Sequence, residues 1–246
     1  MSKEPEVSNE ETLDPEDWES LRVLGHRMLD DALDYQRTVR ERPPWQHAPD
    51  EVAKHFRTPL PQDPQTPEDV YEEFLKYVLP YPVGNIHPRF WGWVFGNGTV
   101  FAAFAEMMAA AMNSNSGGLD YHSANYVEQQ VIDWVKEMLK YPLAASGLLT
   151  SGCSAANLIG LTVARNAKAG HDIRREGLTA GGRRMMLYAS SEIHSSIAKA
   201  VELHGLGSDS LRLVPVNANF QIDIELLKEA IDQDRCEGHQ PFCVIG

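Results

Sequence analysis

The chain has 246 residues, of which 43% are hydrophobic and 23% charged, and this balance predicts a globular protein with a sizeable core. Its net charge of −13 disfavours nucleic acid as a partner, because phosphate neutralisation requires clustered Lys and Arg side chains. Residues 1–69 hold 17 acidic and 8 basic side chains, so most of the negative charge belongs to the N-terminal segment.

The three cysteines are Cys153, Cys236 and Cys243, and their spacing fits neither a disulfide framework nor a thiolate metal site. The first 20 residues lack the basic start and apolar stretch of a signal peptide, and no run of about 18 apolar residues exists to cross a membrane. We therefore expect a cytoplasmic protein with reduced thiols, no metal site and no membrane partner.

Residues 1–13 are polar, and we expect them to form a disordered tail. A helix is predicted to follow, with Asp14 as its N-cap and a proline at its first position. Apolar side chains recur at helical spacing from Trp18 to Val39, so the pattern predicts one long amphipathic helix that runs until Pro43.

Residues 43–67 contain seven of the fifteen prolines, which predicts an extended segment. A second helix is expected from Thr66, as N-cap, to just before Pro80. A helical segment over 14–83 with little apolar surplus needs a surface to lie on. It is either an arm on a partner subunit or a lid on its own domain.

From Gly84 onward the chain reads as a second region. An aromatic loop over 85–93 precedes a small-residue helix from Thr99 to Met112 and a helix from Tyr121 to Lys140. After Pro142 helices and strands alternate, which predicts βαβ units around a parallel sheet in the α/β class. The expected elements are a helix over 151–169, a strand over 185–189, a helix over 193–204, a strand over 211–216, a helix over 223–233 and a strand over 242–245.

The segment Gly147-Leu-Leu-Thr-Ser-Gly-Cys-Ser-Ala-Ala-Asn157 suggests a phosphate site. We expect a short strand to enter a turn of small residues that opens directly into a helix, whose N-terminal amides attract anions. The hydroxyl of Ser154 can add a hydrogen bond. The same pattern also fits an ordinary Ser-capped helix, and it matches neither GxxxxGK[ST] nor GxGxxG.

His194 follows the expected strand that ends near Ala189 and precedes a helix expected to begin near Ile193. It therefore belongs at the carboxyl edge of the sheet, where open α/β folds bind ligands. A histidine there can act as an acid or base, or lie flat against a ring, although it can equally be structural.

Four segments, in this order and spacing, resemble the pyridoxal-phosphate-dependent amino-acid decarboxylases of group II, which include aromatic-L-amino-acid, histidine and glutamate decarboxylases. They are His87-Pro-Arg-Phe-Trp-Gly92, Glu128 to Leu139, Ser151 to Asn157, and Ser191 to Ala200 with the following Gly205-Leu-Gly207 and 211–216. The resemblance covers about residues 15–246. It implies a fold-type I, aspartate-aminotransferase-like large domain over 84–246, preceded by a helical arm over 14–83 that interlocks two subunits of a homodimer.

The resemblance also implies pyridoxal 5′-phosphate as cofactor and assigns roles to three residues. Cys153 and Ser154 match the positions that hold the cofactor phosphate, through backbone amides and the Ser hydroxyl. His194 matches the histidine that stacks on the pyridine ring and bears on proton transfer at the substrate carbon. The family more often has Gly or Ala in place of Cys153 and Glu in place of Ala155. Lys199 also matches a family lysine, but its position within a helix indicates a structural role.

The family's Schiff-base lysine lies in a His-Lys pair late in the chain, and none of the eight lysines in this sequence follows a histidine. We therefore expect a truncated chain, about the first half of a decarboxylase, that is inactive by itself. The complete protein would release CO₂ from an amino acid, which the pattern does not identify. The alternatives are a carbon–carbon lyase or aminotransferase of the same fold, and a non-catalytic dimerising module.

Overall fold

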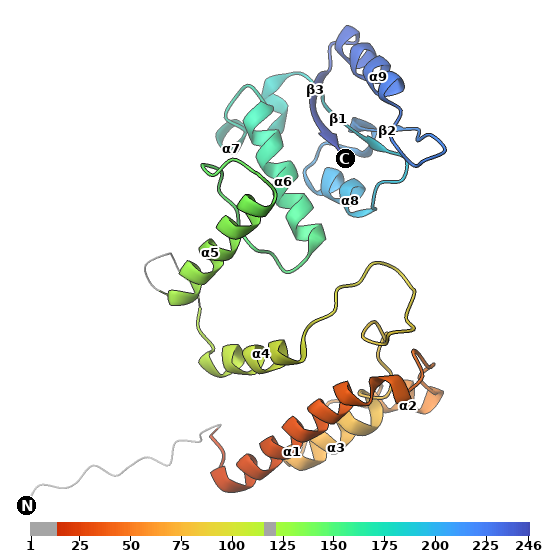
Figure 1. Ribbon diagram of the computed structural model, residues 1–246. Coiled ribbons are helices and arrows are strands. Elements are labelled where there is room, and N and C mark those ends of the chain that lie inside the picture. Colours follow the sequence, from red (N-terminus) through yellow and green to blue (C-terminus); the bar gives the residue numbers. More distant parts are fainter. Residues whose placement is uncertain (1–13, 116–121) are drawn as a thin grey trace, which may run out of the picture. The chain divides into compact units, whose positions relative to one another are not determined.

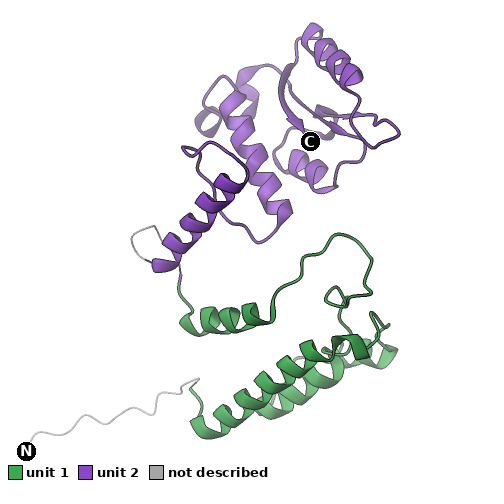
Figure 2. Cartoon of the chain, viewed as in Figure 1, with its two compact units in different colours: residues 1–114 green, residues 115–246 purple. Residues whose placement is uncertain are grey.

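The computed structural model describes residues 14–115 and 122–246, so the disordered tail expected over 1–13 lies outside the described residues. The chain divides into two compact units, which we call unit 1 (residues 1–114) and unit 2 (residues 115–246) (Figure 2). No helix in the described ranges combines the length and apolar character needed to span a membrane.

Unit 1 is helical (Figure 1). Its long helices α1 and α3 lie side by side: Arg27 pairs with Glu72 at 2.6 Å, and the Tyr71 hydroxyl donates to Asp31 at 2.9 Å. The elements of unit 1 are α1 (Trp18–Arg37), the 3₁₀ turn η1 (Val39–Glu41), α2 (Asp50–His55), α3 (Pro67–Tyr77) and α4 (Val100–Met112).

The first helix begins one turn later than the sequence suggests. Its N-cap is Asp17, whose carboxylate accepts hydrogen bonds from the backbone N–H groups of Glu19 and Ser20 and from the Ser20 hydroxyl, so the prediction of Asp14 was wrong. The helix ends at Arg37, before η1, rather than running until Pro43. A serine three residues after the cap gives Asp17 a hydroxyl partner as well as the two amides.

The proline-rich segment is not extended throughout, because α2 lies within it. Residues 50–58 are free of proline, and Pro49 occupies the N-cap, where its missing N–H costs nothing. Asp50 and Glu51 in the first turn, with Lys54 and His55 in the last, match the helix dipole. The charges at its two ends therefore favour this short helix, which the number of prolines in the segment did not predict.

The predicted cap of α3 at Thr66 is confirmed, and α4 has a threonine cap at Thr99 as well. Thr66 accepts a hydrogen bond from the backbone of Asp69 at 3.1 Å, and Thr99 accepts one from Ala102 at 3.2 Å. Between these helices Gly84 has a φ of +86°, and a Cβ there would lie 1.7 Å from the carbonyl oxygen of Pro44. Only glycine permits so close an approach of the aromatic loop to the proline segment.

Unit 2 is a three-stranded parallel sheet with helices on both faces, which confirms the predicted α/β class. The strand order is β2-β1-β3. The elements of unit 2 are α5 (Ser123–Met138), α6 (Cys153–Lys168), α7 (Ile173–Glu176), η2 (Leu178–Gly181), β1 (Met185–Ser190), α8 (Ser196–Leu203), η3 (Ser208–Ser210), β2 (Leu211–Val214), α9 (Ile224–Cys236) and β3 (Gln240–Ile245).

The core of unit 2 is built on β1, whose side chains alternate between two clusters. Met185 and Leu187 pack against α6 and α8, while Met186 and Tyr188 pack against α9. Leu187 and Tyr188 are completely buried. A strand covered on both faces reads as a continuous apolar run, as Met185–Ala189 does. This arrangement puts the N-terminal end of α8 at the carboxyl end of β1.

Candidate functional site

The segment that leads into α6 is held by α5. The carboxylate of Glu128 accepts a hydrogen bond from the backbone N–H of Leu149 at 2.8 Å, and the Lys136 ammonium donates to the carbonyls of Leu143 and Ala145 at 3.0 and 2.9 Å. A Cβ at Gly147 would lie 3.0 Å from Ile132 of the same helix. Residues 147–150 therefore follow the surface of α5.

The expectation of a short strand before the turn was wrong. Residues 147–150 carry no strand assignment and belong to no ladder of the three-stranded sheet, although their apolar residues Leu148 and Leu149 suggested one. The contacts to α5 explain the difference, because the Leu149 N–H is paired with a side chain rather than with a neighbouring strand.

The N-terminus of α6 is open to solvent. Gly152 is the N-cap of α6, and no side chain of the described residues caps this helix. A Cβ at Gly152 would meet nothing within 4 Å, so the space beside it is open. Cys153 and Ser154, the first two helical residues, are exposed. Backbone N–H groups at a helix start and the positive end of its dipole attract an anion such as a phosphate. The geometry here thus fits the anion site that the sequence indicates.

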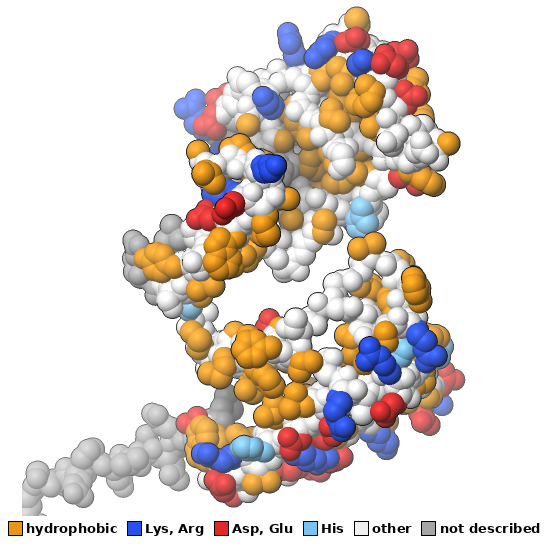
Figure 3. Space-filling view, viewed as in Figure 1, with side chains coloured by type: hydrophobic (Ala, Val, Ile, Leu, Met, Phe, Trp, Pro, Cys, Tyr) orange, Lys and Arg blue, Asp and Glu red, His pale blue; other side chains and the backbone are white. Residues whose placement is uncertain are grey.

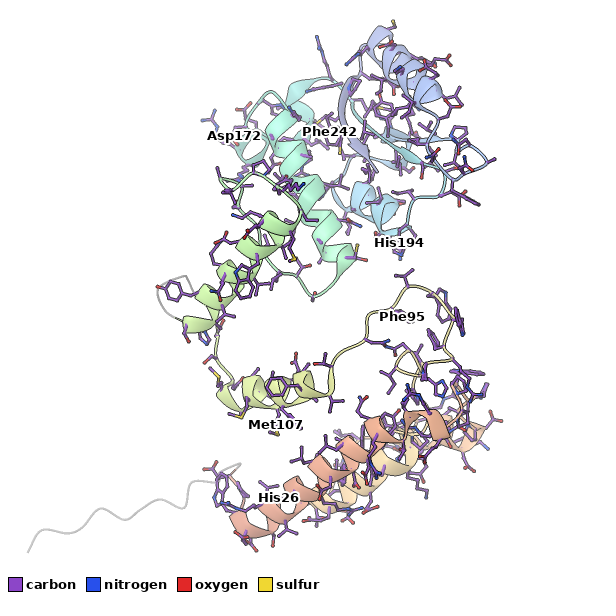
Figure 4. All side chains as sticks on the ribbon, in the orientation of Figure 1. His26, Phe95, Met107, Asp172, His194 and Phe242 are labelled. Carbon is purple, nitrogen blue, oxygen red and sulfur yellow. The ribbon has the colours of Figure 1, made fainter. Side chains whose placement is uncertain are left out.

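His194 lies in the loop between β1 and α8, beside the start of α8 (Figure 4). The loop follows Ser190 at the carboxyl end of β1, so the predicted sheet-edge position is confirmed, although α8 begins at Ser196 rather than near Ile193. The imidazole is exposed. Its Nδ1 lies 2.9 Å from the Ser196 hydroxyl and accepts a hydrogen bond from the Ser196 backbone N–H at 3.2 Å.

Asn157 and Ser196 connect the two predicted parts of the site. The Asn157 side-chain amide donates to the Ser196 hydroxyl at 3.0 Å and lies 3.6 Å from the sulfur of Cys153. The first turn of α6 and the His194 loop are therefore joined by side-chain hydrogen bonds. The sequence motif contains both residues, but only the fold shows that they meet, because 38 positions separate them along the chain.

A second set of contacts fixes α6 against α8 at the other end. The His204 Nε2 lies 3.1 Å from the Leu158 carbonyl and 3.2 Å from the Thr162 hydroxyl, and Arg165 donates to the His204 carbonyl at 3.3 Å. Burial lowers the pKa of His204, and the nearby Arg165 charge lowers it further. The two helices are thus joined at both ends.

Lys199 and one further group of residues lie outside these contacts. Lys199 is exposed on α8. A group of three potential metal ligands lies at the C-terminal end of α9, where one ligand atom from each residue lies within 4.8 Å of the others: Asp234, Glu237 and His239. Asp234, however, accepts hydrogen bonds from Arg212 and Tyr188, so its carboxylate is already engaged.

Comparison with known proteins gives one family. The model of the pyridoxal-dependent decarboxylase conserved domain matches residues 49–246. An aromatic-L-amino-acid decarboxylase of Bacillus atrophaeus is 28% identical over 229 residues, which cover 92% of this chain and 46% of that protein. An L-2,4-diaminobutyrate decarboxylase of Acinetobacter baumannii is 30% identical over 158 residues, which cover 59% of this chain and 31% of that protein. The chain spans about half the length of the curated relatives that match most of it.

Solved structures agree with these relatives. The crystal structure of Oryza sativa TDC with PLP and tryptamine superposes with a TM-score of 0.81 at 25% identity, covering 95% of this chain and 49% of that one. The glutamate decarboxylase domain of a Vibrio parahaemolyticus protein gives a TM-score of 0.80 at 25% identity, with 96% and 52% covered. The expected fold-type I class is confirmed, and the expected cofactor, pyridoxal 5′-phosphate, agrees with the family description.

Proposed function

Because the chain belongs to the pyridoxal-dependent decarboxylase family, we propose that it forms the phosphate-binding portion of an enzyme that releases CO₂ from an amino acid. One observation carries the proposal: the open N-terminus of α6 is joined to His194 through Asn157 and Ser196. An anion site next to an exposed imidazole, at the carboxyl edge of a parallel sheet, suits a phosphorylated ring-shaped cofactor.

Pyridoxal phosphate, when bound, supplies an electron sink that stabilises the negative charge left on the substrate carbon after CO₂ departs. In the proposed site the backbone N–H groups of Cys153 and Ser154, with the Ser154 hydroxyl, bind the phosphate. The open space around Gly152 lets the phosphate approach the backbone. The imidazole of His194 would contact the cofactor ring, and from there it would serve as an acid or base toward the substrate carbon.

The proposal is tested by comparing pyridoxal phosphate with pyridoxal, which lacks the phosphate, in equilibrium binding to the 246-residue protein. We expect tighter binding of pyridoxal phosphate. Ser154→Ala should weaken it by about tenfold or more and leave pyridoxal unchanged, because a hydrogen bond to a charged group is lost. The exposed Ser208, on η3, provides the matched control in Ser208→Ala. Equal affinity for the two ligands would contradict the phosphate site.

His194→Ala separates the ring contact from the phosphate contact. It should weaken pyridoxal and pyridoxal phosphate alike, by about two- to tenfold, because an aromatic stacking contact is lost from both complexes. Selective weakening of pyridoxal phosphate would instead assign His194 to the phosphate and overturn its role at the ring.

In the same proposal the 246 residues alone form no covalent link to the cofactor, because none of the eight lysines follows a histidine. Borohydride treatment of the mixture followed by peptide mass mapping checks this, and a stoichiometric adduct on a single lysine would contradict it. Sequencing the gene beyond Gly246 separates the alternatives. An in-frame continuation with Asp-Ala and His-Lys pairs supports the decarboxylase, whereas its absence favours a non-catalytic dimerising module.

Residues 14–83 act in this proposal as an arm that packs on a second copy of the chain, with residues 84–246 as the cofactor-binding domain. Support comes from the apolar side chains that unit 1 leaves exposed (Figure 3), among them Trp18 at 65%, Val23 at 64% and Leu60 at 81%. Sedimentation equilibrium should give a dimer for the full chain, and Val23→Asp with Leu60→Asp should shift it toward monomer. A monomeric unmodified chain would contradict the arm.

The proposed compartment is the cytoplasm. Cys153, Cys236 and Cys243 are all unpaired thiols, which is compatible with a reducing environment. Fluorescence of a C-terminal fusion in the source cell tests this, and export of the protein would contradict it.

A further inference from the structure

The hydroxyl of Ser196 occupies a buried position between the two parts of the site. Ser196 is only 4% exposed, yet its Oγ lies 2.9 Å from Nδ1 of His194 and 3.0 Å from Nδ2 of Asn157. With these two partners the buried hydroxyl both donates one hydrogen bond and accepts one. Ser196 therefore links a residue of α6 to an exposed imidazole.

The direction of these hydrogen bonds follows from their donors. The side-chain nitrogen of Asn157 can only donate, so the Ser196 oxygen accepts from it and directs its own hydrogen to His194 Nδ1. The backbone N–H of Ser196 donates to the same ring nitrogen at 3.2 Å. Two donors thus converge on Nδ1.

A neutral imidazole that accepts at Nδ1 carries its proton at Nε2. Because Nδ1 is engaged from two directions, both the tautomer and the plane of the ring are set before any ligand arrives. Asn157 also lies 3.6 Å from the sulfur of Cys153, so the same side chain touches the first turn of α6. Hydrogen bonds through Ser196 and Asn157 therefore connect the orientation of the His194 ring to the first turn of α6.

We propose that Ser196 and Asn157 are positioning residues that hold His194 in its Nε2–H tautomer, with its ring plane fixed relative to the N-terminus of α6. A catalytic role for this orientation of His194 rests on the proposed function, in which His194 contacts the cofactor ring. The hydrogen-bond arrangement itself does not depend on that function. Neither residue touches the reacting atoms in this proposal, since each acts through His194.

Nitrogen-15 NMR of histidine-labelled protein, without cofactor, measures the tautomer directly, and His194→Gln assigns the signal. The unmodified protein should show the Nε2–H form. Ser196→Ala should lower the ratio of Nε2–H to Nδ1–H by about two- to tenfold, as expected for the loss of one neutral hydrogen bond. Ser196→Thr keeps the hydroxyl and should restore the ratio. An unchanged ratio in Ser196→Ala would overturn the proposal.

Asn157→Asp gives an independent check, because a carboxylate accepts the Ser196 hydrogen and withdraws it from His194. It should lower the tautomer ratio in the same direction as Ser196→Ala. The control is Ser195→Ala: Ser195 is exposed, adjacent in sequence and makes no side-chain cap at the start of α8. A ratio that responds equally to Ser195→Ala would contradict a specific role for Ser196.

The binding measurements keep this inference separate from the proposed function. If His194→Ala leaves the affinity for pyridoxal unchanged, the proposed role of His194 at the ring fails, whatever the tautomer. If His194→Ala weakens pyridoxal binding but Ser196→Ala alters neither the tautomer nor the affinity, the positioning inference fails while the function stands.

Discussion

Arg212 of β2 and Asp234 of α9 form a two-point ion pair, with Nη2 to Oδ1 at 2.6 Å and Nε to Oδ2 at 3.2 Å. Asp234 also accepts a hydrogen bond from the buried Tyr188 hydroxyl at 2.8 Å. Hydrogen bonds from Arg212 hold the pKa of Asp234 below its usual range. The carboxylate of α9 is thus joined to the neighbouring strands β1 and β2 of the sheet.

Replacing this carboxylate should destabilise unit 2. Asp234→Asn removes the charge from a side chain that is 1% exposed and leaves Arg212 without its partner, so we expect a loss of about 2–3 kcal/mol in the free energy of unfolding. Urea denaturation at neutral pH measures it. Asp232→Asn, which breaks an exposed pair with Arg235, is the matched control and should cost less than about 0.5 kcal/mol.

The ion pair also predicts a direction for acid denaturation. Because the pKa of Asp234 is lower in the folded protein than its ordinary value, its stabilisation is present above the ordinary value. It should be lost as the pH falls through the lowered value. The difference in unfolding free energy between the unmodified protein and Asp234→Asn should therefore shrink on acidification. A difference independent of pH would contradict the assignment.

Gly147 is predicted to tolerate no side chain without strain. An alanine there would place its Cβ 3.0 Å from the buried Ile132, so Gly147→Ala should cost about 1–3 kcal/mol of stability and weaken pyridoxal phosphate binding. Gly160→Ala in the interior of α6 meets nothing within 4 Å and should instead stabilise by about 0.5–1 kcal/mol. Equal effects of the two substitutions would contradict the packing.

Lys136 is predicted to be structural. Its buried ammonium donates to the carbonyls of Leu143 and Ala145, and Lys136→Met would leave both without that donor. We expect a loss of about 1–3 kcal/mol, with faster amide exchange at Leu149 as the segment loosens. The nearby Lys140 is exposed, and Lys140→Met should stay within about 0.5 kcal/mol. Unaltered exchange at Leu149 would contradict the supporting role.

The half-buried His204 should also make the protein less stable in acid, at a higher pH than the Asp234 ion pair does. Burial lowers its pKa, so the folded protein holds it neutral while the unfolded chain takes up a proton below about pH 6.5. The free energy of unfolding should fall as the pH drops through that value. His204→Gln should reduce the slope, which urea denaturation at about pH 7.5 and about pH 5.5 measures. An equal slope in both proteins would contradict the buried neutral state.

Local signals in the sequence were sufficient for most elements. Thr66 and Thr99 mark helix starts because threonine followed by acidic or small residues caps without help from distant parts. The alternation after Pro142 predicts the parallel sheet because strands buried on both faces are apolar throughout. Asp14 and Asp17 are three residues apart, and the sequence alone does not show that Asp17 is the one that accepts hydrogen bonds from Glu19 and Ser20.

The positions of the candidate site residues in the fold were predictable in part. Cys153, Ser154 and His194 stand where the motifs place them, at a helix start and a sheet edge. Ser196 and Asn157 were not assigned roles, because serine and asparagine near helix starts usually serve as caps, and their pairing depends on how α6 and α8 pack. The support from α5 was missed for the same reason: Leu148 and Leu149 suggest a strand unless Glu128 is known to accept a hydrogen bond from the Leu149 backbone N–H.

The contacts that shape the entry to α6 have a consequence for the order of folding. Lys136 reaches carbonyls 7 and 9 residues away, and Glu128 reaches an amide 21 residues away, whereas the Asn157–Ser196 bond spans 39 residues and the pairing of β1 with β3 joins Met185 to Gln240. Short loops close with less entropy cost and sooner than long ones. The segment 147–150 can therefore assemble on α5 early, before β1 has paired with β3.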